Sequence, residues 1–268
     1  MENRRKQKLQ NNMNLKKVII LILSLSFYNC FAQQSEALSL SEIIANNARF
    51  KPYNKTNIET LASIDQHKLI DELNNDNSKN AFWLNIFNSF MLLNLRDTAN
   101  AGDYKRFYKS KNIEIAGRKF SLYNIEHEFL RCGVKNKSLG FKKSEFGKKD
   151  SLWKKLRPTK TDFKVVFCIY RGMYGFPPFQ IIENADVKRA FDDFFSQYIQ
   201  NFSDGKNLLM YDWVMKYKKD LKEKPIEEIF AGHIITYIKT PNAVYIDNFL
   251  PKYEKVKFKE EEINPWLK

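Results

Sequence analysis

The pattern of apolar and polar positions predicts a helix-rich chain with a few short strands. Apolar residues recur at helical spacing over residues 39–47, 58–74, 81–95, 121–131, 186–201, 211–221 and 226–239. Alternation around Gly117 predicts a hairpin over 113–120, and the apolar runs 164–170 and 243–247 predict a buried strand and a closing strand. Because helices predominate and the strands are scattered, we expect an α+β fold, a single helix-rich domain with a small antiparallel sheet.

The stretch 81–95 is almost wholly apolar but contains Asn85 and Asn88. It is too short and too interrupted by polar residues to span a bilayer, so we expect a buried core helix. Residues three apart lie on the same helix face, and an unsatisfied buried amide costs about 1–3 kcal/mol. The two asparagines therefore either brace a neighbouring loop, which we favour, or take part directly in a site.

The first 32 residues have the pattern of a secretory signal peptide. Six basic residues and the apolar stretch 18–28 precede Cys30-Phe-Ala32, which matches a small-x-small cleavage site. We therefore expect residues 33–268 to form the mature domain, exported to the periplasm or the exterior and without a transmembrane segment. A lipoprotein anchor at Cys30 is the less favoured alternative.

Positive charge is concentrated in residues 135–160. The formal net charge of the chain is +14, and it falls to about +9 without the first 32 residues. Phe141, Phe146 and Trp153 lie among the lysines of this stretch, a pattern that would suit a polyanion site. We favour a solvated insertion whose aromatic residues hold it to the core, and we do not expect a nucleic-acid partner for an exported protein.

Few residues can carry acid–base or metal chemistry. The histidines are His67, His127 and His233, and no Cys/His spacing resembles a zinc site, so we expect no metal and no cofactor. His127 lies about 140° from Leu122 on a helical wheel, on the flank of the apolar stripe, where a side chain can face a cleft. The mature cysteines, Cys132 and Cys168, can form one disulfide in an oxidising compartment, or Cys168 is a buried small hydrophobe.

Three segments carry distinctive motifs: the apolar run 81–93 around Trp83, the segment 121–131 with Ile125-Glu126-His127 and Leu130-Arg131, and the loop Gly172-Met-Tyr-Gly-Phe-Pro-Pro178. Together they resemble the bacterial Domain of Unknown Function 547 family. The resemblance extends over residues 58–250, with weaker matches at 216–221 and at 245–250, where Asp247 is the retained acid. It implies a distant relation to papain-like cysteine peptidases and a papain-like fold, with His127 as the base for a cysteine just before the paired prolines.

This sequence departs from that pattern at the nucleophile, because Phe176 stands before the prolines. A phenylalanine can neither attack a carbonyl nor lose a proton, so the resemblance predicts a pseudoenzyme that binds a peptide or other envelope ligand. A second departure is Val165 or Val166, where the family often shows a histidine. The alternative is a thiol-dependent hydrolase or amidase in which Cys168 or Cys132 acts with His127. The candidate binding residues are Asn85, Asn88, Glu126, Arg171, Tyr174 and Phe176; the oligomeric state is not indicated.

Overall fold

The computed structural model describes residues 35–50, 54–96, 104–133, 144–173, 175–215, 217, 226–230 and 232–239. The chain divides into two units, residues 1–35 and 36–268, and all helices and strands below belong to the second. The expected signal peptide and the expected strand 243–247 lie outside the described residues and stay predictions.

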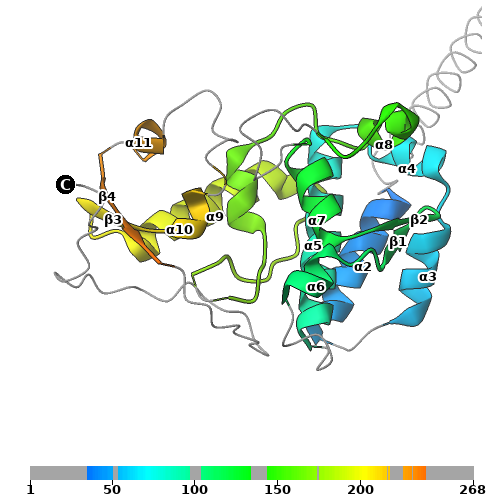
Figure 1. Cartoon of the computed structure of the whole chain (residues 1–268), viewed down its shortest axis with the longest axis horizontal. Helices are drawn as coiled ribbons and strands as arrows, with labels where there is room; N and C mark the ends of the chain where they lie inside the picture. Colours follow the sequence, from blue (N-terminus) through cyan, green and yellow to red (C-terminus); the bar gives the residue numbers. More distant parts are fainter. Residues whose placement is uncertain are drawn as a thin grey trace, which may run out of the picture. The chain divides into compact units, whose positions relative to one another are not determined.

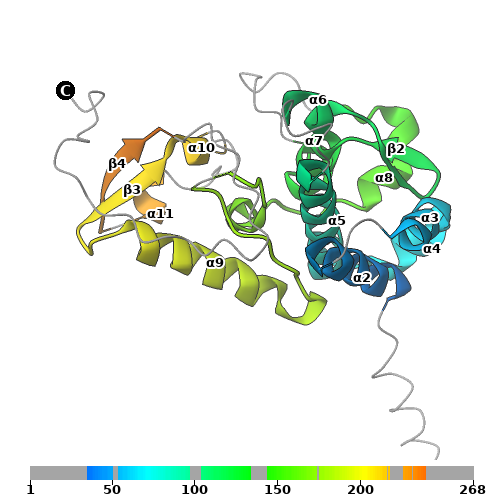
Figure 2. The ribbon, with the colours of Figure 1, turned by 90° about the horizontal axis from the view of Figure 1, so that it is seen from below.

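Four consecutive helices begin the second unit (Figure 1). They are α2 (Glu36–Phe50), α3 (Lys55–Ser63), α4 (Gln66–Glu72) and α5 (Asp76–Arg96), and α2 packs along α5 (Figure 2). The expected single helix over 58–74 is wrong, because the chain breaks between α3 and α4. Asp65 causes the restart: its side chain accepts a hydrogen bond from the backbone nitrogen of Lys68 at 2.9 Å and so caps α4.

The expected hairpin is confirmed. After α6 (Tyr104–Lys109), a helix that the pattern did not predict, β1 (Ile113–Ile115) pairs antiparallel with β2 (Arg118–Phe120), and Ile113 lies opposite Phe120. The expected helix over 121–131 is present but has two parts, α7 (Leu122–Asn124) and the π-helix η1 (Ile125–Leu130). Ser121 caps it as predicted, accepting from the backbone nitrogen of Asn124 at 3.0 Å.

The next segment contains η2 (Lys148–Asp150) and α8 (Ser151–Lys155), followed by η3 (Phe163–Cys168). The expected strand over 164–170 is wrong, because residues 163–168 form a 3₁₀ helix packed on α9 (Val187–Phe202), which follows η4 (Asn184–Asp186). The reason is that a short, continuously buried apolar run does not distinguish a strand from a helix. The expected helix over 186–201 is confirmed by α9.

A second, parallel pair of strands lies beyond α9. Strand β3 (Asn207–Tyr211) pairs with β4 (Ile234–Ile238), in a register that places Asn207 opposite Ile234. Between them lie α10 (Asp212–Met215) and α11 (Ile226–Ile229). The expected helix over 226–239 is therefore wrong beyond its first turn, because the β-branched run from Ile234 finds a strand partner in β3. The structure describes only part of the expected helix over 211–221, and that part contains α10, which is one turn long.

Helix α5 is the centre of the core and is buried on nearly all of its faces, as its low amphipathicity requires. Trp83 stacks on Phe129 with ring centroids 3.7 Å apart, and its Nε1 donates to the carbonyl of Leu156 at 2.9 Å. Among the described helices, α5 included, none is both long and apolar enough to cross a membrane. The fold is thus α+β and helix-rich, with a small antiparallel sheet and a separate parallel pair.

The two asparagines of α5 hold the chain that follows η3. Asn85 makes a reciprocal pair with the backbone of Ile182, accepting at 2.8 Å and donating at 2.9 Å. Asn88 donates to the carbonyl of Cys168 at 3.0 Å and accepts from the nitrogen of Tyr170 at 2.9 Å. Both amides are fully buried, so they serve as substitutes for the backbone partners that a sheet would have supplied.

We expect Asn88→Ala to lower the free energy of unfolding by about 2–4 kcal/mol, because it leaves the Cys168 carbonyl and the Tyr170 amide buried without this partner. Urea unfolding measures the change. Asn46→Ala, at an exposed position of α2, is the matched control and should change stability by less than about 0.5 kcal/mol. Equal effects of the two substitutions would contradict the bracing role.

Candidate functional site

The π-helix η1 positions the three ionisable residues of the Ile-Glu-His-Glu motif. The nitrogen of Arg131 donates to the carbonyl of Glu126 at 2.9 Å, a five-residue step that is typical of a π-helix. Such segments occur frequently at functional sites. Glu126, His127 and Glu128 are all buried, and their side chains contact three different sets of partners.

Glu126 forms a buried ion pair with Arg171. The hydroxyls of Tyr108 and Tyr217 donate to the same carboxylate at 2.6 and 2.8 Å. Arg171 also donates to the hydroxyls of Tyr104 and Tyr217, each at 2.9 Å. We call these five residues the Glu126 cluster; it joins α6, η1, the chain after η3 and the chain after α10 through one charged centre.

The electrostatics of the Glu126 cluster keep its ion pair charged. Burial by itself would raise the pKa of Glu126, but the guanidinium of Arg171 and other nearby positive charge lower that pKa to about 2. Burial by itself would lower the pKa of Arg171, but Glu126 holds it well above its ordinary value. Burial raises the pKa of Tyr104, Tyr108 and Tyr217, so the three phenols stay protonated at neutral pH.

Glu128 anchors a different part of the chain. Its carboxylate pairs with Arg157 and accepts hydrogen bonds from the Ser144 hydroxyl, at 2.5 Å, and from the backbone nitrogen of Glu145. Both glutamates of the motif therefore hold other parts of the chain, and they face away from each other because residues two apart in a helix do not share a face.

His127 is buried between Tyr123 and Arg131. Its ring centroid lies 4.2 Å from that of Tyr123, and its Nδ1 lies 3.0 Å from a terminal nitrogen of Arg131. Arginine can only donate hydrogen bonds, so Nδ1 must accept, and the neutral ring then carries its proton on Nε2. In this tautomer Nε2 donates and cannot take up a proton. The geometry thus argues against the base role that the family resemblance implies for His127.

The loop from Arg171 to Pro178 approaches its neighbours closely through two glycines. Gly172 has φ 61°, and a Cβ there would lie 2.3 Å from the Cδ1 of Leu95. Gly175 has φ 79°, and a Cβ there would lie 2.5 Å from the ring of Tyr211. Both positions therefore require glycine for backbone and for space. Tyr174, a predicted binding residue, lies outside the described residues.

Phe176 is fixed by Trp213. The two rings are stacked with centroids 4.7 Å apart and an interplanar angle of 21°, and the indole Nε1 of Trp213 donates to the carbonyl of Gly175 at 2.9 Å. The side chain before the paired prolines is thus part of an aromatic stack and is half-buried.

The two cysteines of the described chain are free thiols. Cys168 is fully buried, and burial raises the pKa of its thiol well above the ordinary value, which opposes formation of a thiolate. Cys132 is half-buried, and its Sγ donates to the carbonyl of Pro158 at 3.4 Å. Only Cys132 is partly accessible, two residues beyond the end of η1.

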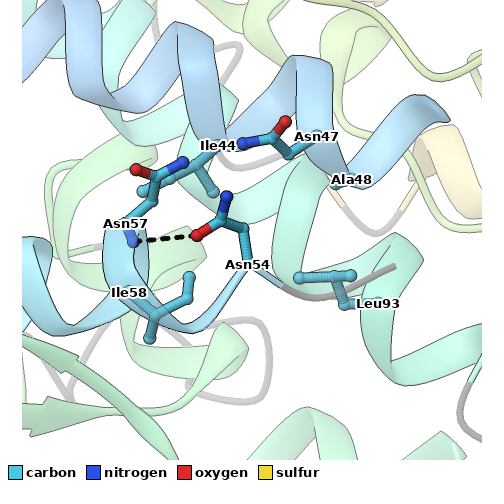
Figure 3. A pocket seen from close by; sticks show the side chains of 7 residues that line it. All are labelled: Ile44, Asn47, Ala48, Asn54, Asn57, Ile58 and Leu93. Carbon is cyan, nitrogen blue, oxygen red and sulfur yellow. Dashed lines mark hydrogen bonds between the residues drawn. The ribbon is translucent and has the colours of Figure 1, made fainter. Parts of the chain in front are cut away.

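A small pocket lies away from all of these residues, at the meeting of α2, α3 and α5 (Figure 3). It has about 200 Å³ of empty volume, including space open to solvent. Its lining combines three asparagines with aliphatic residues: Ile44, Asn47, Ala48, Asn54, Asn57, Ile58 and Leu93. The amide oxygen of Asn54 accepts from the nitrogen of Asn57 at 3.3 Å, which caps α3. None of the predicted site residues lines this pocket.

The structure brings some of the predicted site residues together and separates others. Glu126 and Arg171 form one ion pair, whereas Asn85 and Asn88 hold backbone and Phe176 stacks on Trp213. The sequence reasoning missed the three tyrosines of the Glu126 cluster. A glutamate on a helix that is expected to be buried indicates that a cation and hydroxyl donors lie nearby. The sequence does not show which residues these are, because the partners of Glu126 are 18, 45 and 91 residues away.

The fold and the Glu126 cluster define a helix-rich α+β protein built around a buried ion pair. Residues 70–199 match the model of a family described as "Protein of unknown function, DUF547". The match includes the three motifs at 81–93, 121–131 and 172–178, and it does not include the weaker resemblance expected at 216–221 and 245–250. Comparisons with curated proteins and with solved structures give no significant match.

We expect Glu126→Gln to destabilise the fold by about 3–5 kcal/mol at neutral pH, because it leaves Arg171 buried without its counter-charge. Urea unfolding at several pH values tests this. The carboxylate pKa is lowered from 4.5 to about 2, so its contribution to stability is present above about pH 4.5 and is lost as the pH falls toward 2.

The variant should lack this acid-dependent loss, which is on the order of 3 kcal/mol for the original chain. Glu59→Gln, at an exposed position of α3, is the control and should change stability by less than about 1 kcal/mol. An unchanged slope of stability between pH 4.5 and pH 2 in Glu126→Gln would contradict the assignment.

The hydrogen bond from Arg131 predicts the tautomer of His127. Nitrogen-15 NMR of the imidazole at neutral pH should show a protonated Nε2 and an unprotonated Nδ1. Arg131→Leu, which cannot donate, should remove this bias if the variant stays folded. A native ring that carries its proton on Nδ1 would refute the proposed geometry.

Proposed function

We propose that this chain is an exported, non-catalytic binding protein on a cysteine-peptidase-like frame, and that it binds a peptide or other envelope ligand beside the loop 171–178. The observation that carries the proposal is the stack of Phe176 on Trp213, at the place where the family resemblance puts the nucleophilic cysteine. A ring in that place offers apolar contact area and no nucleophile.

Two further observations support the absence of thiol chemistry. The Cys168 thiol is buried where a thiolate is disfavoured, so it does not replace the missing nucleophile. The Nδ1 of His127 accepts from Arg131, so moving the proton from Nε2 to Nδ1 would set two N–H groups against each other. The histidine therefore serves better as a hydrogen-bond donor than as a general base.

The framework around the loop suits binding for a separate reason. Arg171 is held in the Glu126 cluster, and Gly175 is held by Trp213, so the loop is anchored at two points that precede Phe176. A pre-ordered loop loses little conformational entropy when it binds a ligand. A ligand could therefore contact the groups that the loop already exposes, among them Phe176, without first ordering the loop.

A thiol hydrolase remains the second candidate, and Cys132 is the residue that favours it. Its thiol is half-buried, unlike that of Cys168, and it follows His127 by five residues at the end of the same helix. In this alternative His127 would have to release its hydrogen bond from Arg131 before it could accept a proton from the thiol.

We expect the purified full chain to show no turnover above buffer with peptide, amide and ester substrates, because no activated nucleophile is in place among the residues that the structure describes. Native alkylation followed by peptide mapping should leave Cys168 unmodified until the chain is unfolded. Turnover that His127→Ala or Cys132→Ser abolishes, in a variant that still folds, would overturn the proposal and establish the second candidate.

The binding half of the proposal has its own assay. Native mass spectrometry with a pool of short peptides should detect complexes that Phe176→Ala weakens by about tenfold, the loss of one aromatic anchor. Phe50→Ala, which removes an exposed phenylalanine of α2, is the matched control and should leave the complexes unchanged. Equal effects of the two substitutions would refute a site at the loop.

A further inference from the structure

The basic stretch that ends at Lys160 has a large excess of positive charge. Residues 134–160 contain two acidic side chains, Glu145 and Asp150, and ten basic ones: Lys135, Lys137, Lys142, Lys143, Lys148, Lys149, Lys154, Lys155, Arg157 and Lys160. The structure describes this stretch from Ser144 onward.

The two arginines in and beside this stretch are paired with carboxylates, and Glu145 has an amide partner. Asp150 pairs with Arg118 at 2.5 Å, and Arg157 pairs with the buried Glu128. Glu145 accepts a hydrogen bond from the amide of Asn124 at 3.0 Å. Because Arg157 is largely buried and paired with Glu128, the arginine within this stretch does not offer its guanidinium to a phosphate or a base edge.

Four lysines of the described part are exposed: Lys149, Lys154, Lys155 and Lys160. We call them the lysine group. Across the described ranges of the chain, none of the four takes part in an ion pair. The nearby Asp76 binds the backbone nitrogen and hydroxyl of Thr159, at 2.8 and 2.5 Å, so its charge reduces the local potential without cancelling it.

The two described aromatic residues of the stretch are buried in the core. Phe146 and Trp153 are 6% and 7% exposed, and Trp153 packs edge-on against Phe120 with ring centroids 4.8 Å apart. This packing fixes α8 to the hairpin, as the sequence predicted for these aromatics. It also leaves neither ring free to stack on a nucleic-acid base, which is how basic aromatic surfaces hold single strands.

We propose that the lysine group is a docking surface for an anionic phospholipid bilayer. A bilayer surface presents many negative headgroups without fixed geometry, and exposed lysines on a rigid support provide attraction without demanding a specific fork geometry. The absence of available arginine forks and of free aromatic rings among the described residues of this stretch favours a lipid surface over a nucleic acid. The inference does not depend on the ligand site at the loop.

Flotation of the full chain with vesicles tests this surface. The vesicles are phosphatidylcholine alone or phosphatidylcholine with about one third phosphatidylglycerol, between about 50 and 300 mM salt. The test variant replaces Lys149, Lys154, Lys155 and Lys160 by Gln. A control variant with the same change in net charge replaces four exposed lysines elsewhere, Lys105, Lys111, Lys188 and Lys206, by Gln.

A second control replaces Lys6, Lys8, Lys16 and Lys17 by Gln, because the first residues are also basic and precede an apolar stretch. We expect salt-sensitive binding to the anionic vesicles that the test variant weakens by about tenfold or more and that both controls largely keep. Equal losses in the test variant and either control, or no preference for anionic vesicles, would overturn the proposal. The proposal would also be overturned if the chain bound a DNA oligonucleotide but no vesicles, and if only the test variant, and neither control, lost the DNA binding.

Discussion

The buried ion pair between Glu126 and Arg171 is the interaction on which the rest of this structure depends. Removing both charges from water is costly, and a single ion–ion contact seldom offsets that cost. Here three tyrosine hydroxyls complete the hydrogen bonding of the pair, and burial keeps those phenols neutral. Residues from α6, η1, the chain after η3 and the chain after α10 meet at this centre, so the loop 171–178 takes its starting position from an electrostatic requirement rather than from packing alone.

Helix α5 fixes the other end of the same region by a different means. Its asparagine side chains make backbone hydrogen bonds of the kind that a neighbouring strand would have made. Asn85 binds the backbone of Ile182, and Asn88 binds the backbone of Cys168 and Tyr170. Irregular chain can be buried beside this helix because its polar backbone groups are satisfied by side-chain amides. The ion pair and the two amides together anchor the described residues of the 168–182 segment, which contain little regular structure.

The structure holds the motif residues in internal contacts and leaves the lysine group exposed. Glu126 is engaged in its cluster and His127 with Arg131, and Phe176, which cannot act as a nucleophile, stacks on Trp213. At the surface, the lysine group forms no ion pair with the described residues, although Asp76 lies nearby. The difference between the paired arginines and the exposed lysines follows from the chemistry of the two side chains. A guanidinium can form two parallel hydrogen bonds with a buried carboxylate, whereas an ammonium group is strongly hydrated and stays at the surface.

The sequence by itself determined the class of fold, the buried helix at 81–95, the hairpin at 113–120, the cap at Ser121 and the helix that became α9, because periodicity and turn chemistry are local properties. It also determined that a phenylalanine, Phe176, stands before the paired prolines. Only the tertiary structure decided that residues 163–168 form a 3₁₀ helix and that residues 234–238 form a strand. Each outcome depended on a partner elsewhere in the chain, α9 for the first and β3 for the second. The partners of Glu126 and the tautomer of His127 were likewise decided in three dimensions, because a buried charge is satisfied by groups that meet in space and lie far apart along the chain.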